Sequence, residues 1–208
     1  MTAREEILRR VRAAKVAAPE QGIRRDYSHV RTHSDRLGQF VQRVEDYQAT
    51  VIRTHSDNVA AAVAKCLVDA RKVVVPQGFD PSWVPDGLNI LGDEPPLRAD
   101  ELNAVDAVLT CAVVGIAETG TIVLDHTAGM GRRTLTLVPD LHVCVVTADQ
   151  VVGDVPEAVA RLSSSVKAGR PLTWISGGSA TVDIELQRVE GVHGPRTLCV
   201  ILVDPAVL

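Results

Sequence analysis

The sequence has few aromatic side chains and no apolar run long enough to cross a membrane. Aromatic residues make up 3% of the 208 residues. The core must therefore be built from aliphatic side chains, as is typical of layered α/β proteins. No apolar stretch approaches the roughly 20 residues that a transmembrane helix needs. The N-terminus carries Glu5 and Glu6 and lacks the apolar centre of a signal peptide, so a cytoplasmic location is expected.

Concentrated basic charge and clustered cysteines are lacking as well. The formal net charge of −4 argues against a nucleic-acid partner, which would require a basic face. The cysteines are scattered, with no C-x-x-C pair and no histidine at ligand spacing. Each lies in an apolar run, so each is expected to be a small buried hydrophobe. These positions are Cys66, Cys111, Cys144 and Cys199. No metal site and no cofactor are expected in this chain.

Three common motifs of nucleotide and hydrolase sites are absent. The chain contains neither G-x-G-x-x-G nor G-x-x-x-x-G-K-[ST], so a standard dinucleotide or P-loop nucleotide site is not supported. It also lacks G-x-S-x-G, the turn that presents the nucleophile in α/β hydrolases.

Short apolar runs alternate with helical patterns along most of the chain. Residues 115–121 are predicted to turn between two antiparallel strands, and Asp154 is predicted to cap a helix that begins near Pro156. Buried strands are predicted at 72–76, 105–114, 122–124, 141–147, 172–175 and 197–203, shorter strands near 89–91 and 132–139, and helices over 34–51, 56–70 and from about Ala180. This order predicts an α/β three-layer sandwich whose sheet is mostly parallel and carries an antiparallel hairpin.

The N-terminal part has a different character. Residues 1–55 are predicted to form a helical extension that packs on an α/β domain of residues 56–208. Up to Arg53 the chain has 11 Lys and Arg against 7 Asp and Glu, a net charge of +4, so the remainder carries −8. This basic character fits a solvated helix face, or a contact surface for an acidic partner or a second copy of the chain.

Residues 172–196 are the best candidate for one wall of a ligand site. Gly177 and Gly178 are predicted to turn between a strand and a helix. The amides of the next three residues, 179–181, would then face an anion at the helix N-terminus. The alternative is an ordinary helix cap, which Asp183 and Glu185 favour because they already place negative charge in the first turn.

The loop after this segment carries two further candidates. His193 could transfer protons, or simply hold the loop through a hydrogen bond. Arg196 could bind a carboxylate or phosphate through two hydrogen bonds, or pair with Glu190. Arg132 and Arg133 could bind an anionic substrate or remain solvated surface charges. His126 and His142 are less suited to chemistry, since His142 falls within a strand pattern.

Glu118 is a carboxylate between an apolar strand and a Thr-Gly-Thr turn. It could act as nucleophile, general base or substrate clamp, or it could fix the loop by accepting backbone N–H groups. Ligands of open α/β sheets bind beyond the carboxyl ends of the strands. The loops at 76–78, 115–121, 176–181 and 192–196 are therefore expected to converge on one pocket.

Four ordered segments resemble the lactate-utilisation (LUD) domain family, in its short form. They are GIAETGTIVL (115–124), RRTLTLVPDLHVCVV (132–146), SGGSATVDIE (176–185) and GVHGPR (191–196). The resemblance implies the NagB/RpiA/CoA transferase-like fold of sugar-phosphate isomerases, CoA transferases and formyltetrahydrofolate cyclo-ligases. It also implies a role in oxidising L-lactate to pyruvate with two iron–sulfur partner proteins. Longer members bind clusters in a C-terminal extension that this sequence lacks, so the iron–sulfur clusters are expected on the partners.

Three functions remain open at this point. The chain could be an enzyme subunit that binds a small carboxylate or phosphate, a non-catalytic scaffold for the iron–sulfur partners, or an acyl- or CoA-transferase- or isomerase-like enzyme that uses Glu118. A homodimer is possible in each case. The expected catalytic residues are Glu118 and His193. The expected binding residues are Gly78, Thr119, Gly120, Thr121, Arg133, Gly177, Gly178, Ser179, Ala180, Thr181, Gly194 and Arg196.

Overall fold

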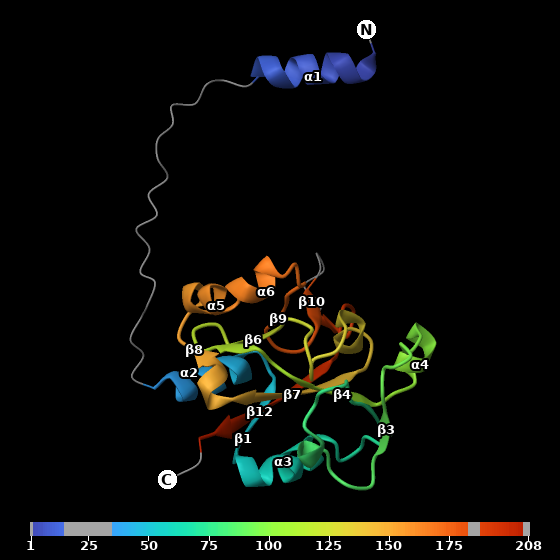
Figure 1. The fold of residues 1–208 in the computed structure, drawn as a ribbon, viewed down its shortest axis with the longest axis vertical. Coiled ribbons are helices and arrows are strands. Elements are labelled where there is room, and N and C mark those ends of the chain that lie inside the picture. The colour runs from blue at the N-terminus through green and yellow to red at the C-terminus, as the bar shows by residue number, and fades with distance from the viewer. Residues whose placement is uncertain (1, 15–34, 183–187, 206–208) are drawn as a thin grey trace.

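A six-stranded parallel sheet forms the centre of the molecule (Figure 1). The computed structural model describes residues 2–14, 35–182 and 188–205. Every pairing in the central sheet is parallel. Its strands, in spatial order, are β1 (Thr50–His55), β12 (Thr197–Asp204), β7 (Leu141–Thr147), β4 (Ala107–Cys111), β2 (Lys72–Val74) and β3 (Asn89–Leu91).

A smaller, mixed sheet packs against the central one. It has the order β8 (Val151–Val152), β5 (Val114–Ile116), β6 (Thr121–Leu124) and β9 (Thr173–Ile175). Strands β5 and β6 form the predicted antiparallel hairpin, with Glu118 in its turn. Strand β9 pairs antiparallel with β6 and is an edge strand of this sheet, so the side chain of Trp174 is 41% exposed. The strand predicted at 172–175 is confirmed as β9, but the prediction that it is buried is wrong.

Helices cover both faces of the central sheet, because its strands are apolar on both sides. Along β7, Cys144 and Val146 face α2 (Arg36–Asp46) and the smaller sheet, whereas Val143 and Val145 face α3 (Val59–Cys66). Successive side chains of a strand point to opposite faces of the sheet, and here both faces are buried. The predicted α/β fold with a mostly parallel sheet is confirmed. The remaining helices are α1 (Ala3–Ala14), α4 (Ala99–Asn103), α5 (Val155–Arg161) and α6 (Ser163–Lys167), with 3-10 turns η1 (Ser56–Asn58), η2 (Pro81–Trp83), η3 (Arg133–Thr136) and η4 (Ala148–Gln150).

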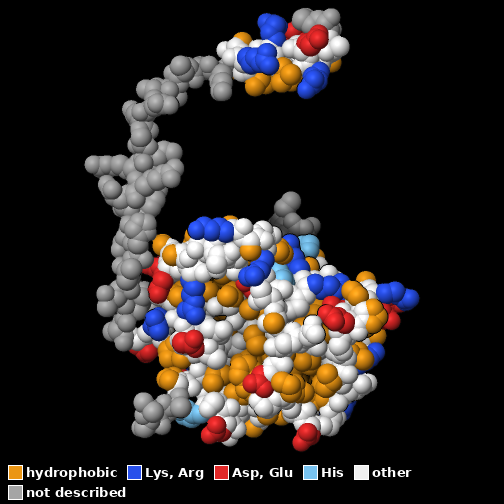
Figure 2. All heavy atoms as spheres, in the orientation of Figure 1, with side chains coloured by type: hydrophobic (Ala, Val, Ile, Leu, Met, Phe, Trp, Pro, Cys, Tyr) orange, Lys and Arg blue, Asp and Glu red, His pale blue; other side chains and the backbone are white. Residues whose placement is uncertain are grey.

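The N-terminal part divides into two kinds of structure. Helix α2 buries Phe40 and Val44 in the core, and β1 belongs to the central sheet, so much of 1–55 is integral to the α/β unit. The helix predicted for 34–51 ends at Asp46, since the β-branched run of residues 50–52 favours a strand. Helix α1 buries none of its residues and displays apolar and basic side chains (Figure 2). Within the described part of the chain, every helix is too short or too polar to span a bilayer.

Other local predictions are corrected by tertiary contacts. The segment 105–114 divides into β4 and β5, which belong to different sheets. The strand expected near 132–139 is replaced by the 3-10 turn η3. Two of the four cysteines are not free: Cys66 at the end of α3 and Cys199 in β12 form a disulfide, with Cα atoms 6.4 Å apart. The two cysteines are 133 residues apart in the sequence, so their spacing did not predict this pairing.

The most consequential correction concerns the residues that follow Gly178. No helix begins at Ala180: β10 (Ala180–Val182) pairs antiparallel with β11 (Arg188–Glu190). The hairpin is closed by a hydrogen bond from the Gly191 amide to the Ser179 carbonyl, at 2.9 Å. The β-branched Thr181 and Val182 favour this extended conformation. The helix dipole that the predicted anion site required is therefore missing.

Candidate functional site

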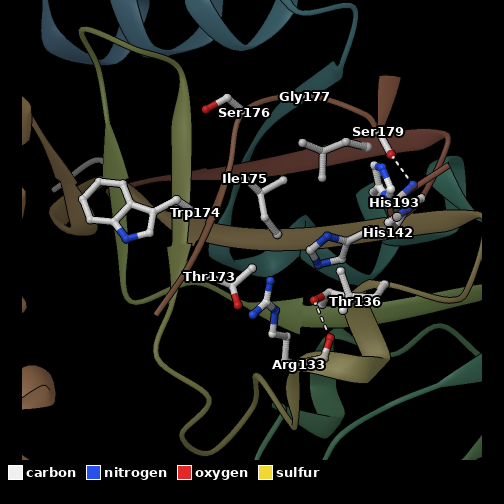
Figure 3. Close-up of a pocket in the computed structure, with 14 residues that line it drawn as sticks. Arg133, Thr136, His142, Thr173, Trp174, Ile175, Ser176, Gly177, Ser179 and His193 are labelled. Atoms are coloured by element: carbon white, nitrogen blue, oxygen red, sulfur yellow. Dashed lines mark hydrogen bonds between the residues drawn. The ribbon is translucent and has the colours of Figure 1, made fainter. Parts of the chain in front are cut away.

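A cavity of about 260 Å³ lies between β9 and the amino-terminal ends of β7 and β12 (Figure 3). We call it cavity 1. The parallel register pairs His142 of β7 with Leu198 of β12, which places both side chains on its floor. The turn η3 and the loop 193–195 supply the sides, and 173–177 supply the opposite wall. Its polar lining consists of Arg133, Thr136, His142, Thr173, Ser176, Ser179 and His193.

His142 is the most deeply buried polar side chain among those that line cavity 1. Its side chain is 1% exposed, and its Nε2 lies 2.7 Å from the hydroxyl of Thr110 on β4. Nδ1 has no hydrogen-bond partner among the described residues. Burial lowers the pKa of His142 to about 4, so the imidazole is neutral at physiological pH. A neutral ring with one unpartnered nitrogen can donate a hydrogen bond to a ligand or accept one from it.

Arg133 supplies the positive charge of the site. Its guanidinium has no hydrogen bond or ion pair with any residue that the structure describes, and Figure 3 shows it directed toward the cavity. The neighbouring Arg132 is different: it holds Asp93 through two hydrogen bonds, of 2.6 and 3.0 Å. Of the two consecutive arginines, Arg133 is therefore the one available to bind an anion.

The loop that carries His193 is fixed by Ser179. The His193 amide donates to the Ser179 hydroxyl at 3.0 Å, and the Ser179 amide donates to the Pro195 carbonyl at 2.7 Å. These bonds bring His193 and Gly194 to the rim of cavity 1. They also occupy the Ser179 amide, which was predicted to face an anion. Ser179 thus holds the wall of the site through its backbone and side chain.

Cavity 1 opens at the amino-terminal ends of two central strands. The prediction placed the site beyond the carboxyl ends, where loops 76–78 and 115–121 were expected to join it. Gly78 follows β2 at the opposite end of the sheet and does not line cavity 1. The smaller sheet causes this difference, because β9 lies against the amino-terminal ends of β7 and β12 and closes a hollow there.

Glu118 and Thr119 line a different cavity, of about 300 Å³, together with Arg43, Asp46 and Tyr47. The expected pairing of Glu118 with His193 in one pocket is therefore wrong. A chain of hydroxyl groups links the two places. The hydroxyl oxygen of Thr121 lies 2.7 Å from that of Thr119 and 2.7 Å from that of Ser176. Ser176 in turn lines cavity 1.

Several predicted binding residues pack against other parts of the chain, and of these only Gly177 also lines cavity 1. Gly120 and Gly177 both have positive φ and lie directly against α2 and the residue after it, Tyr47. Gly178 lies against the carbonyl of Arg196, and Ala180 and Thr181 belong to β10. Arg196 does not line cavity 1, and its Nε lies 3.4 Å from Asp140 Oδ1. Of the predicted set, cavity 1 is lined by Arg133, Gly177, Ser179, His193 and Gly194.

Comparison with known proteins shows the family to which the chain belongs. The LUD domain matches residues 93–203, more than half of the chain. The chain belongs to the LUD domain family. A protein of Deinococcus radiodurans named lactate utilization protein C is 54% identical over 167 residues, which cover 80% of this chain and 79% of that protein. A protein of the same name from Halalkalibacterium halodurans is 26% identical over an aligned region that covers 96% of this chain and 94% of that protein.

A crystal structure supports the same relationship. A DUF162 family protein from Deinococcus radiodurans superposes with a TM-score of 0.74 at 47% identity, and covers 85% of this chain and 99% of that chain. Every residue that lines cavity 1 falls inside the matched LUD domain. Arg43, Asp46 and Tyr47 of the Glu118 cavity fall outside it.

Sequence reasoning missed several residues of the LUD domain that line cavity 1. His142, Thr136, Thr173 and Trp174 were not among the predicted site residues. For His142 a signal exists: it is a strongly polar side chain in the otherwise mostly apolar run 141–147, where a buried polar group needs a specific partner. The others lie at strand edges and turns, whose neighbours only the fold determines.

Proposed function

We propose that this chain is a subunit of a system that oxidises L-lactate to pyruvate, and that cavity 1 binds the carboxylate substrate or product. The observation that carries the proposal is Arg133, whose guanidinium has no partner in the described part of the chain. It lines the same cavity as the buried, neutral His142, and that cavity lies wholly within the LUD domain. The names of the two relatives support the choice of lactate. Iron–sulfur partner proteins would carry the electrons away.

The chemistry of the lining suits a small 2-hydroxy acid. A guanidinium binds a carboxylate through two parallel hydrogen bonds, which fixes its orientation as well as its charge. A neutral imidazole can form a hydrogen bond with the hydroxyl or keto oxygen beside that carboxylate. The volume of about 260 Å³ is below that of cavities that hold drug-sized ligands. Cavity 1 therefore favours a compact anion.

The proposal is tested by titrating the purified chain with L-lactate and with pyruvate in a calorimeter. Arg133→Gln should weaken binding by about tenfold or more, because it removes a charge-assisted hydrogen-bond donor. Arg196→Gln is the matched control: it removes an arginine of the same domain that lies outside cavity 1, and binding should not change. If neither acid binds the wild-type chain, or if both variants bind equally well, cavity 1 is not the carboxylate site.

Glu118→Gln separates this function from acyl or CoA transfer. Glu118 lines another cavity, so we expect the variant to bind L-lactate as the wild type does. An acyl-transfer function through Glu118 would instead show as binding of CoA that the variant loses. That result, without lactate binding, would replace the proposed function.

A non-catalytic scaffold is the second candidate, and one observation favours it. Helix α1 buries no residue, and Ile7, Leu8 and Val11 are all exposed on it. Glu6 of α1 is held by Arg9 and Arg10 of the same helix, and the apolar side chains form an exposed stripe that a partner could cover. This stripe is a candidate contact with the iron–sulfur proteins.

A double substitution tests the contact. Ile7→Ser with Val11→Ser should abolish most co-purification with the iron–sulfur partners, because apolar anchors dominate such interfaces. Val68→Ser is the control, since Val68 is equally exposed but lies after α3. Undiminished co-purification of the double variant would exclude α1 as the contact.

A further inference from the structure

A second, larger cavity lies on the opposite side of Arg133. We call it cavity 2; its volume is about 840 Å³. It opens where β2 and β3 end, between the segments 75–77, 92–96 and 126–133. This is the carboxyl edge of the parallel sheet, the place where α/β proteins most often bind ligands. Neither Glu118 nor His193 lines it.

The walls of cavity 2 are held firmly by hydrogen bonds. The Gly129 amide donates to the carbonyl of Gln77, and the Cys111 amide donates to the carbonyl of Gly129, both at 2.8 Å. The loop after β6 is thereby fixed to the exits of β2 and β4. On the other side, Arg132 binds Asp93 through both carboxylate oxygens. Asp93 is neutralised by this pair and does not repel an anion.

A thin partition separates the two cavities. His126 has a φ of +61°, an uncommon backbone conformation for a residue with a side chain. Its ring is held at both ends: Nδ1 lies 2.8 Å from the Gly131 carbonyl oxygen, and Nε2 lies 2.8 Å from the Thr173 hydroxyl. His126 lines cavity 2, Thr173 lines cavity 1, and Arg133 lines both.

The lining of cavity 2 combines one available cation with an apolar wall. Arg133 is unpaired within the described residues, whereas Glu94 is exposed at the rim and is screened by water. Pro76, Pro96 and Pro171 contribute flat apolar surface. A ligand that satisfies both features has an anionic group and a planar apolar body.

We propose that cavity 2 binds a phosphorylated heteroaromatic molecule of mononucleotide size, with its phosphate on Arg133 and its ring system against the prolines. This site shares Arg133 with cavity 1, but the rest of its lining is separate, and the proposal does not require that cavity 1 binds a carboxylate. The ligand of cavity 2 and the anion of cavity 1 meet at Arg133, so each weakens the binding of the other.

Flavin mononucleotide and riboflavin are a matched pair of probes, because they share the ring and differ in the phosphate. Fluorescence anisotropy of each should rise on addition of the chain, with flavin mononucleotide bound about tenfold more tightly. Arg133→Gln should remove that difference. Gly92→Trp should weaken both probes at least tenfold, since a Cβ at Gly92 meets no atom within 4 Å and the ring can occupy the cavity.

Gly194→Val is the control for location. Gly194 lines cavity 1, and a Cβ there makes only ordinary contacts, at 3.6 Å or more. The variant should weaken the binding of L-lactate and leave the binding of flavin mononucleotide unchanged. Gly92→Trp should do the reverse. No anisotropy change in the wild type, equal affinity for the two probes, or binding untouched by Gly92→Trp would each overturn the proposal. Flavin mononucleotide binding without lactate binding would contradict the proposed function alone.

Discussion

The free energy of unfolding should fall by about 3 kcal/mol between pH 6.5 and pH 4, and His142→Gln should lose most of this dependence. Burial lowers the pKa of the folded-state imidazole from 6.5 to about 4. Between these values the unfolded chain binds a proton that the folded chain does not. Acidification through this window therefore favours the unfolded state. Well above pH 6.5 the imidazole is neutral in both states, and its contribution is constant.

Urea unfolding at several pH values between 4 and 7 measures the effect. Glutamine does not titrate in this range and can keep a hydrogen bond to Thr110, so the variant remains comparable with the wild type. His193→Gln is the matched control: His193 lines the same cavity but is exposed, and its replacement should leave the slope unchanged. A slope that survives in His142→Gln would show that another group is responsible.

Gly120→Val is expected to destabilise the fold by about 3–5 kcal/mol. Gly120 has a φ of +60°, which a β-branched residue adopts only with strain. Its added Cβ would also lie 2.4 Å from the carbonyl carbon of Arg43 and 2.6 Å from the amide nitrogen of Val44. Both are backbone atoms of α2 and cannot rotate away. The helix must move, and Phe40 and Val44 would leave the core with it.

Thermal and urea unfolding of the variant give the magnitude. Gly92→Ala is the control, because its Cβ meets open space and its φ is not in the positive range, so its effect should stay within about 0.5 kcal/mol. If both variants lose a similar amount of unfolding free energy, the contact with α2 is not what destabilises Gly120→Val. A loss confined to Gly120→Val would show that the 119–121 turn is a docking point for α2.

The two variants also separate stability from binding. Gly120 does not line cavity 1, so the folded fraction of Gly120→Val should bind L-lactate as the wild type does. His142→Gln changes the floor of cavity 1 directly, and its affinity for lactate should change even at pH 7, where the imidazole of the folded wild type is neutral.

The central strands were predictable because their signal is local. Strand β7 is predicted at the residues it occupies, 141–147, and the prediction of 197–203 for β12 ends one residue before the strand does. Both predictions follow from short, mostly apolar runs, which are typical of strands that are covered on both faces. The β5–β6 hairpin is equally readable from its turn residues. The edge elements were not: β1 was merged into the preceding helix, and β10 was taken for a helix start. Short polar segments are decided by their neighbours, which the sequence does not reveal.

The sequence by itself determined the α/β class, the family and the segments that carry polar groups, because these follow from hydrophobic periodicity and from ordered local motifs. Only the tertiary structure decided which of those groups meet. It separated Glu118 from His193, paired Arg196 with Asp140 outside the lining of cavity 1, and brought His142 and Arg133 to one cavity. The physical reason is that the smaller sheet packs against the amino-terminal ends of β7 and β12. That contact joins residues far apart in the chain and depends on the packing of two whole layers.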